Sequence, residues 1–183
     1  MTPADGTDAA KSAPSFIWGP NSGMALVVLS ATALLDQAHK WWTILIYRIE
    51  EKGRVAVLPF FDLVYTVNTG ISYSLLDGKS YTWQLTLAAF AALASLAMWI
   101  WIARGGAGLL MSLSLALIAG GAIGNGIDRI TLGGVADFFL LHAFGYSWYV
   151  FNIADVAIVA GVLGLLYESL IGPSSRNDAV KSP

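Results

Sequence analysis

The sequence predicts an all-α membrane protein, with four transmembrane helices and a small β-sheet outside the bilayer. Of its 183 residues, 56% are hydrophobic and only 12% are charged, whereas soluble domains carry about 25% charged residues. The mean hydropathy is +0.65. Four apolar stretches each have roughly the 20 residues that a helix needs to cross the hydrocarbon core. A chain this poor in charge cannot form the polar shell of a soluble domain, so lipid is its expected solvent.

The four predicted spans cover residues 21–42, 83–103, 108–127 and 149–171. The first is apolar from Met24 to Leu35 and ends in polar residues followed by two tryptophans, as is typical of a membrane interface. An alternative treats this stretch as a cleaved signal peptide. Its small-residue site, Ala31-Thr-Ala33, lies inside the apolar run rather than after it, which favours a retained span.

The remaining segments divide the chain into three parts. Residues 1–18 and 172–183 are rich in polar and small residues, and we expect them to be disordered tails of a single membrane domain at 19–171. The loop at 47–80 contains two runs with β-branched and aromatic character, Val55–Leu58 and Phe61–Val67, which predict the small sheet. We expect residues 128–148 to be a connection between the third and fourth spans.

Several classes of function are excluded by what the sequence lacks. The net charge is −2 with no basic tract, so no nucleic-acid partner is expected. There is no cysteine, which excludes disulfides, thiolate metal sites and a cysteine nucleophile. The zinc-protease motif His-Glu-x-x-His and the serine-hydrolase motif Gly-x-Ser-x-Gly are both missing. The two histidines, His39 and His142, are expected to be interfacial or solvated.

Polar residues gather at the end of the spans that carries the two long loops. Such residues are costly in or near hydrocarbon unless they are paired or wetted, so they point to function. On a continued third span, Asn125, Asp128 and Arg129 share one helix face. Beyond them, Asp137 lies in the connection, and Asp155 lies near the start of the fourth span.

Two of these acids, Asp137 and Asp155, have spacing that lets them meet at the membrane surface. Two carboxylates in one site share a proton, so one can accept a proton from water while the other polarises a carbonyl. This is the chemistry of an aspartic protease. Spacing alone leaves open that Asp137 caps a loop and Asp155 caps the last helix. Two further alternatives are a small proton-coupled transporter, which predicts acids spread across the bilayer depth, and a non-catalytic membrane scaffold.

The polar residues also occur as four ordered blocks over residues 35–166, and in this they resemble the lipoprotein signal peptidase (signal peptidase II) family. The blocks are Asp36-Gln-x-x-Lys40, Asn68-Thr-Gly70-Ile-Ser-Tyr73, Gly120 to Arg129 followed by Gly134-Val-Ala-Asp137-Phe138, and Phe151-Asn152-Ile-Ala-Asp155. The glycines of the third block allow close helix packing. The second block departs from the usual Asn-x-Gly-Ala-Ala-Phe at Ile71, Ser72 and Tyr73.

The resemblance implies a membrane aspartic endopeptidase that removes signal peptides from bacterial prolipoproteins, cleaving before a diacylglyceryl-modified cysteine. Asp137 and Asp155 would be catalytic, without a metal or cofactor. The implied partners are lipid-modified prolipoproteins and membrane lipids. The implied supporting residues are Asp36, Lys40, Asn68, Gly70, Asn125, Asp128, Arg129 and Asn152.

The chemistry of these residue types suggests individual roles. Asn68 and Asn125 are neutral donors for substrate backbone, and Arg129 is suited to pair with Asp128 or to hold the lipid ester. Asp36 and Lys40 are four residues apart on one helix face, which favours an ion pair. Ordinary solvation of both groups at the interface is the alternative.

The resemblance also supplies the orientation. It implies an inner-membrane protein with both termini in the cytoplasm, an active site near the periplasmic face and a first loop that cradles the substrate. The number of basic residues on each side does not predict this orientation, because basic residues are usually more frequent on the cytoplasmic side. The tails and the turn at 104–107 hold 4 lysines and arginines, and the opposite side holds 6.

Overall fold

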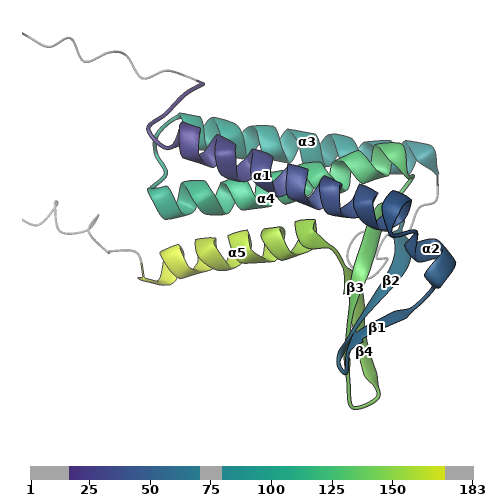
Figure 1. Cartoon of the computed structure of the whole chain (residues 1–183). Coiled ribbons are helices and arrows are strands. Elements are labelled where there is room, and N and C mark those ends of the chain that lie inside the picture. The colour runs from purple at the N-terminus through teal and green to yellow at the C-terminus, as the bar shows by residue number, and fades with distance from the viewer. Residues whose placement is uncertain (1–16, 71–79, 172–183) are drawn as a thin grey trace, which may run out of the picture.

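The computed structural model describes residues 17–70 and 80–171. Four long helices form a bundle, and a small sheet extends from one end of it (Figure 1). The long helices are α1 (Ser22–Trp41), α3 (Tyr81–Ala103), α4 (Leu109–Thr131) and α5 (Ile153–Ile171). One π-helical segment, η1 (Trp42–Ile46), continues α1, and a single turn, α2 (Ile49–Lys52), follows it. Most of both expected tails, and the departing positions Ile71, Ser72 and Tyr73, lie outside the described residues.

The surface of the bundle is apolar and its interior holds the polar groups. Leu34, Phe90 and Leu170 are 69%, 71% and 83% exposed, whereas Asp36 and Asn152 are completely buried. Within the described residues, α3, α4 and residues 153–170 of α5 are long and apolar enough to cross a membrane. Since water would oppose such an inverted arrangement, the bundle is built for lipid.

The central helix, α4, packs against α1, α3 and α5. Glycines make these contacts close. A Cβ atom added at Gly120 would come within 2.6 Å of the Leu29 carbonyl oxygen in α1, and one at Gly121 within 2.5 Å of the Ala154 carbonyl oxygen in α5. Without side chains at these positions, three backbones meet at one level of the bundle.

The sheet has four antiparallel strands in the order β1-β2-β3-β4. Its strands are β1 (Val55–Leu58), β2 (Phe61–Asn68), β3 (Val135–Ala143) and β4 (Tyr146–Phe151). A small sheet is therefore confirmed, but β3 and the start of β4 come from residues 128–148, where we expect only a connection, and the end of β4 lies in the predicted fourth span. β3 pairs with β2 across a long separation, with Asn68 opposite Val135 and Thr66 opposite Asp137. Such non-local pairing leaves no local signal in the sequence.

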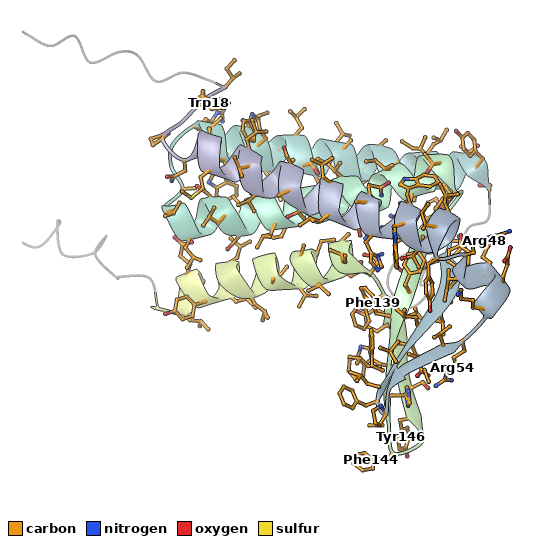
Figure 2. The ribbon with its side chains drawn as sticks, viewed as in Figure 1. Trp18, Arg48, Arg54, Phe139, Phe144 and Tyr146 are labelled. Carbon is orange, nitrogen blue, oxygen red and sulfur yellow. The ribbon has the colours of Figure 1, made fainter. Side chains whose placement is uncertain are left out.

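The hairpin between β3 and β4 turns at Phe144 and Gly145, both with positive φ. Phe144 and Tyr146 at its tip point away from the bundle (Figure 2) and are 100% and 81% exposed.

Two of the long helices have a boundary that differs from the predicted one by several residues. α4 continues to Thr131, so Asp128 is helical, and α5 starts only at Ile153 because residues 146–151 belong to β4.

The sheet lies at the end of the bundle where α1 ends and α5 begins (Figure 1). The start of α1, the end of α5 and the turn between α3 and α4 all lie at the opposite end. Asp137 on β3 and Asp155 on α5 are consequently both at the junction between sheet and bundle.

The close approach of α4 and α5 gives a first prediction. Gly121→Ala places a methyl group against a backbone carbonyl that cannot move independently, and such overpacking costs about 1–3 kcal/mol. We expect a lower midpoint of thermal unfolding in detergent micelles. Gly126→Ala in the same helix is the control, because its Cβ would lie 3.7 Å from the nearest atom, in ordinary contact. Equal midpoints for the two variants would contradict the close packing.

Candidate active site

A buried ion cluster lies where α1 meets α4. Lys40 Nζ is 2.8 Å from Asp36 Oδ2 and 2.6 Å from Asp128 Oδ2, and all three side chains are at most 2% exposed. This confirms the predicted pair between Asp36 and Lys40 and adds a third member. Asp36 Oδ1 accepts a hydrogen bond of 2.9 Å from the backbone N–H of Ala154, and Asp128 Oδ2 accepts one of 3.1 Å from that of Ala136. The cluster therefore joins α1, α4, α5 and β3.

Two asparagines connect this cluster to the two candidate catalytic acids. Asn125 Oδ1 accepts hydrogen bonds from Lys40 Nζ (3.0 Å) and from Asn152 Nδ2 (3.1 Å), and Asn125 Nδ2 donates to Asp155 Oδ1 at 2.9 Å. Asn152 Nδ2 also donates to Asp137 Oδ1 at 2.6 Å. Five of the predicted supporting residues thus form one continuous network, namely Asp36, Lys40, Asn125, Asp128 and Asn152.

Asp155 and Asn152 cap α5 reciprocally. The backbone N–H of Asp155 donates to Asn152 Oδ1 at 2.9 Å, and Asp155 Oδ2 accepts from the backbone N–H of Asn152 at 3.2 Å. This is the arrangement of a capping box, in which two N–H groups at the helix start are satisfied. The capping alternative raised for Asp155 is therefore correct as a description of its backbone contacts, although its carboxylate also reaches a cavity.

Asp137 does not cap a loop, because it lies within β3 opposite Thr66 of β2. Its side chain is 3% exposed. Burial, and then the charge of nearby Asp155, raise the pKa of Asp137 to about 7, against the lowering effects of the Asn152 hydrogen bond, the Lys40 charge and a hydrogen bond from Asn68. Near neutral pH this carboxyl group is therefore divided between its protonated and ionised forms.

A cavity of about 420 Å³ opens onto both aspartates. Its polar end is formed by Asn68, Gly70, Asn125, Arg129, Asp137 and Asp155. The rest of its wall is apolar and comes mainly from α3, α4 and α5, with Leu87, Phe90, Met98, Ile118, Ala122 and Ile158 among the lining residues. An elongated apolar ligand would fit along the helices with a polar group beside the two acids.

Arg129 departs from one expected role. Asp128 is paired with Lys40, while Arg129 Nη1 and Nη2 donate to the backbone carbonyls of Asn125 (3.2 Å) and Gly70 (3.3 Å). Its buried Nε has no partner among the described residues. Since its side chain lines the cavity, Arg129 is available to a ligand.

The eight supporting residues fall into two groups. Asn68, Gly70, Asn125 and Arg129 line the cavity, whereas Asp36, Lys40, Asp128 and Asn152 are buried behind it. Asn68 and Asn125 each direct a hydrogen bond to a candidate catalytic acid, in place of the free donors that the sequence analysis expects for substrate.

Two glutamines make contacts that the sequence did not predict, although Gln37 belongs to the first block. Gln37 Nε2 donates to Asp128 Oδ1 at 2.8 Å, and the fully buried Gln84 donates to the Thr69 carbonyl at 2.7 Å. The second contact ties the chain beside Asn68 to α3. A polar residue in the first turns of an otherwise apolar span is the signal that identifies Gln84.

A separate polar cluster lies on the sheet. Buried Asp62 of β2 is paired with Arg54 and lies 3.1 Å from His142 of β3. Burial alone would raise the pKa of Asp62, but the hydrogen bonds from Arg54 and His142 outweigh it and lower that pKa. His142 is therefore engaged within the sheet, and His39 packs against the rings of Phe138 and Phe139. Neither histidine lines the cavity at the aspartates.

Comparison with known proteins assigns this arrangement to a family. The family model described as "Signal peptidase (SPase) II" matches residues 28–171. A lipoprotein signal peptidase of Rhodopseudomonas palustris is 54% identical over 143 residues, covering 76% of this chain and 87% of that protein. One of Methylocella silvestris is 43% identical over 159 residues, covering 87% and 92%.

A solved structure described as a bacterial membrane enzyme has a TM-score of 0.69 and 26% sequence identity, and the match covers 85% of this chain and 93% of that one. The sequence and structure comparisons each cover most of the chain. The chain therefore belongs to the signal peptidase II family.

Proposed function

We propose that this protein is an aspartic endopeptidase that removes signal peptides from prolipoproteins and cleaves before a diacylglyceryl-modified cysteine. One observation carries the catalytic assignment. Two aspartates from different elements, β3 and α5, line the same cavity, and each accepts a hydrogen bond from an asparagine that is itself held by the buried network. The proposed substrate class follows from the relatives, which are named lipoprotein signal peptidases.

The proposed reaction uses a water molecule between the two carboxyl groups. The ionised carboxylate takes a proton from this water, and the oxygen of the water attacks the scissile carbonyl carbon. The protonated carboxyl group donates to the carbonyl oxygen, which gives a neutral gem-diol. The gem-diol then collapses, the carbon–nitrogen bond breaks, and a proton passes to the α-amino nitrogen of the leaving cysteine.

The cavity fits the two parts of such a substrate. Its apolar wall along α3, α4 and α5 would receive the apolar segment of a signal peptide. Arg129 and Gly70 lie at its polar end, so the cleavage point would sit at the junction between bundle and sheet. We assign the buried residues Asp36, Lys40, Asp128 and Asn152 to the support of the aspartates.

We further propose that α1 is a fourth membrane span, with the sheet on the periplasmic side of the inner membrane and both termini in the cytoplasm. The 20 residues of α1 match the length of its neighbours, and its charged residues Asp36 and Lys40 are neutralised inside the bundle. A transporter fits less well, since the buried acids converge on one end instead of following the bilayer depth.

The aspartate pair gives a second prediction. Asp137→Asn and Asp155→Asn each remove a carboxyl group that must exchange a proton, so we expect turnover of a lipid-modified prolipoprotein to fall at least about 1,000-fold. Cleavage is measured in proteoliposomes that contain the purified variant. Glu51→Gln makes the same chemical change at an exposed side chain on α2 and should leave turnover unchanged. Near-normal cleavage by either aspartate variant would disprove the assignment.

The pKa of Asp137 gives a third prediction. Because one proton must reside on the pair, activity should fall as the pH rises through about 7, where Asp137 loses its proton. The fall belongs to the pair as a unit, since the two acids titrate together. The check is a profile of single-turnover rate against pH. A rate that rises steadily between about pH 6 and pH 9 would contradict a protonated partner.

The orientation gives a fourth prediction, which the absence of cysteines makes simple to test. Phe144→Cys places one thiol at the exposed hairpin tip, and Gly106→Cys places one in the turn between α3 and α4, where a side chain has open space. In spheroplasts, a membrane-impermeant maleimide should label only the first variant. Labelling of the second variant alone would reverse the proposed orientation.

A further inference from the structure

We infer that Lys40 is a positioning residue that sets the amide orientation of Asn125, so that an N–H donor always faces Asp155 and holds it as the ionised member of the pair. This inference rests on the proposed function, because it assigns the roles within the aspartate pair. It concerns a residue that lies behind the cavity and does not line it.

The first step is the hydrogen-bonding capacity of Lys40. Its ammonium group has three donors and no acceptor. The side chain is 1% exposed and has three acceptors in reach, namely Asp36 Oδ2 at 2.8 Å, Asp128 Oδ2 at 2.6 Å and Asn125 Oδ1 at 3.0 Å. Asn125 must therefore turn its carbonyl oxygen toward Lys40.

The second step follows from the shape of the Asn125 side chain. With Oδ1 turned to Lys40, Nδ2 points to Asp155 Oδ1 at 2.9 Å. A flipped amide would set its NH₂ group against the donors of Lys40 and Asn152, and its carbonyl against the Asp155 carboxylate. Because the contacts of Asn125 with Lys40 and Asn152 are buried, water cannot compensate for the clashes there.

The orientation of Asn152 is set from the other side. Its Oδ1 accepts from the backbone N–H of Asp155, which can only donate. Its Nδ2 is therefore directed to Asn125 Oδ1 and Asp137 Oδ1. Two groups that can only donate, the Lys40 ammonium and a backbone amide, thus determine the polarity of the whole network.

Both aspartates accept side-chain hydrogen bonds, Asp155 from Asn125 and Asp137 from Asn152 and Asn68, but their positions on the backbone differ. Asp155 receives donors on both oxygens, from Asn125 Nδ2 and from the backbone of Asn152, and lies in the first turn of α5, where the helix dipole favours negative charge. Asp137 lies on a strand without such a dipole. Asp155 is therefore the base that takes the proton from water, and Asp137 is the acid.

The test is Asn125→Asp, which changes the polarity and leaves the shape nearly unaltered. The new carboxylate keeps an oxygen for Lys40 but presents an oxygen, in place of N–H, to Asp155. The charged groups around position 125 are Lys40 of α1, Asp128 and Arg129 of α4, Asp137 of β3 and Asp155 of α5. We expect turnover to fall about 100-fold relative to the unsubstituted protein near pH 8.

Lowering the pH should reverse part of this loss. Once the new carboxyl group is protonated it can donate an O–H to Asp155, so the deficit relative to the unsubstituted protein should shrink to about 10-fold or less near pH 6. A purely structural defect would not recover in this way. Asn21→Asp is the control. It makes the same change at the start of α1, where Asn21 bonds to Ala107 and Ser112, and it should leave the pH profile unchanged.

The outcomes separate this inference from the proposed function. Normal turnover of Asn125→Asp at every pH, with Asp137→Asn and Asp155→Asn inactive, would overturn the role of Lys40 and Asn125 while leaving the aspartate pair in place. A deficit of Asn125→Asp that does not change with pH would also overturn it. Activity in either aspartate variant would instead remove the proposed function itself.

A measurement on the unsubstituted protein decides the case if Asn125→Asp does not fold. The sequence has five asparagines, so a spectrum of the full chain labelled with ¹⁵N-asparagine contains few side-chain NH₂ signals. The Asn152 signal should shift over the pH range in which turnover changes, because its N–H is bonded to Asp137, whereas the Asn125 signal should shift less, because its N–H is bonded to Asp155, which stays ionised. A shift of the Asn125 signal that is larger than that of the Asn152 signal would overturn the inference.

Discussion

The buried ammonium of Lys40 is the interaction on which the rest of the site depends. It lies 2.8 Å from Asp36 Oδ2 and 2.6 Å from Asp128 Oδ2, and these two side chains in turn accept backbone N–H groups of α5 and β3. One cation thus holds the two elements that carry Asp155 and Asp137. Loss of one partner from such a buried cluster typically costs about 3–5 kcal/mol, since the remaining charges have neither water nor a counterion.

The membrane explains why the site lies at a junction. Hydrolysis needs water and charged groups, which the hydrocarbon core excludes. The apolar surface of the bundle favours its insertion in lipid. At the end of the bundle, the antiparallel sheet pairs its backbone N–H and C=O groups between strands. Glycines at α4 bring α1 and α5 close enough for their polar residues to meet. The cavity consequently has a polar end at the sheet and an apolar wall along the helices.

Much of this arrangement could be predicted from the sequence, and the missing parts have physical reasons. Apolar runs of spanning length predicted the long helices, and the spacing of Asp36 and Lys40 predicted their pair, because both signals are local. The third member, Asp128, comes from another helix, and β3 pairs with a strand of the first loop. Neither contact leaves a periodic pattern. Gln84 and the amide orientation of Asn125 also depend on tertiary contacts. The family resemblance named residues that the structure brings together, without giving these connections.

The proposed reaction requires that Asp137 and Asp155 share one proton in the resting protein. Difference infrared spectroscopy of the full chain in lipid, recorded while the pH is raised through about 7, observes that proton directly. We expect one protonated carboxyl band to disappear with rising pH, and this band to be absent from Asp137→Asn. A spectrum with no titrating carboxyl band, or the same band in the unsubstituted protein and in Asp137→Asn, would contradict the shared proton and the catalytic pair that depends on it.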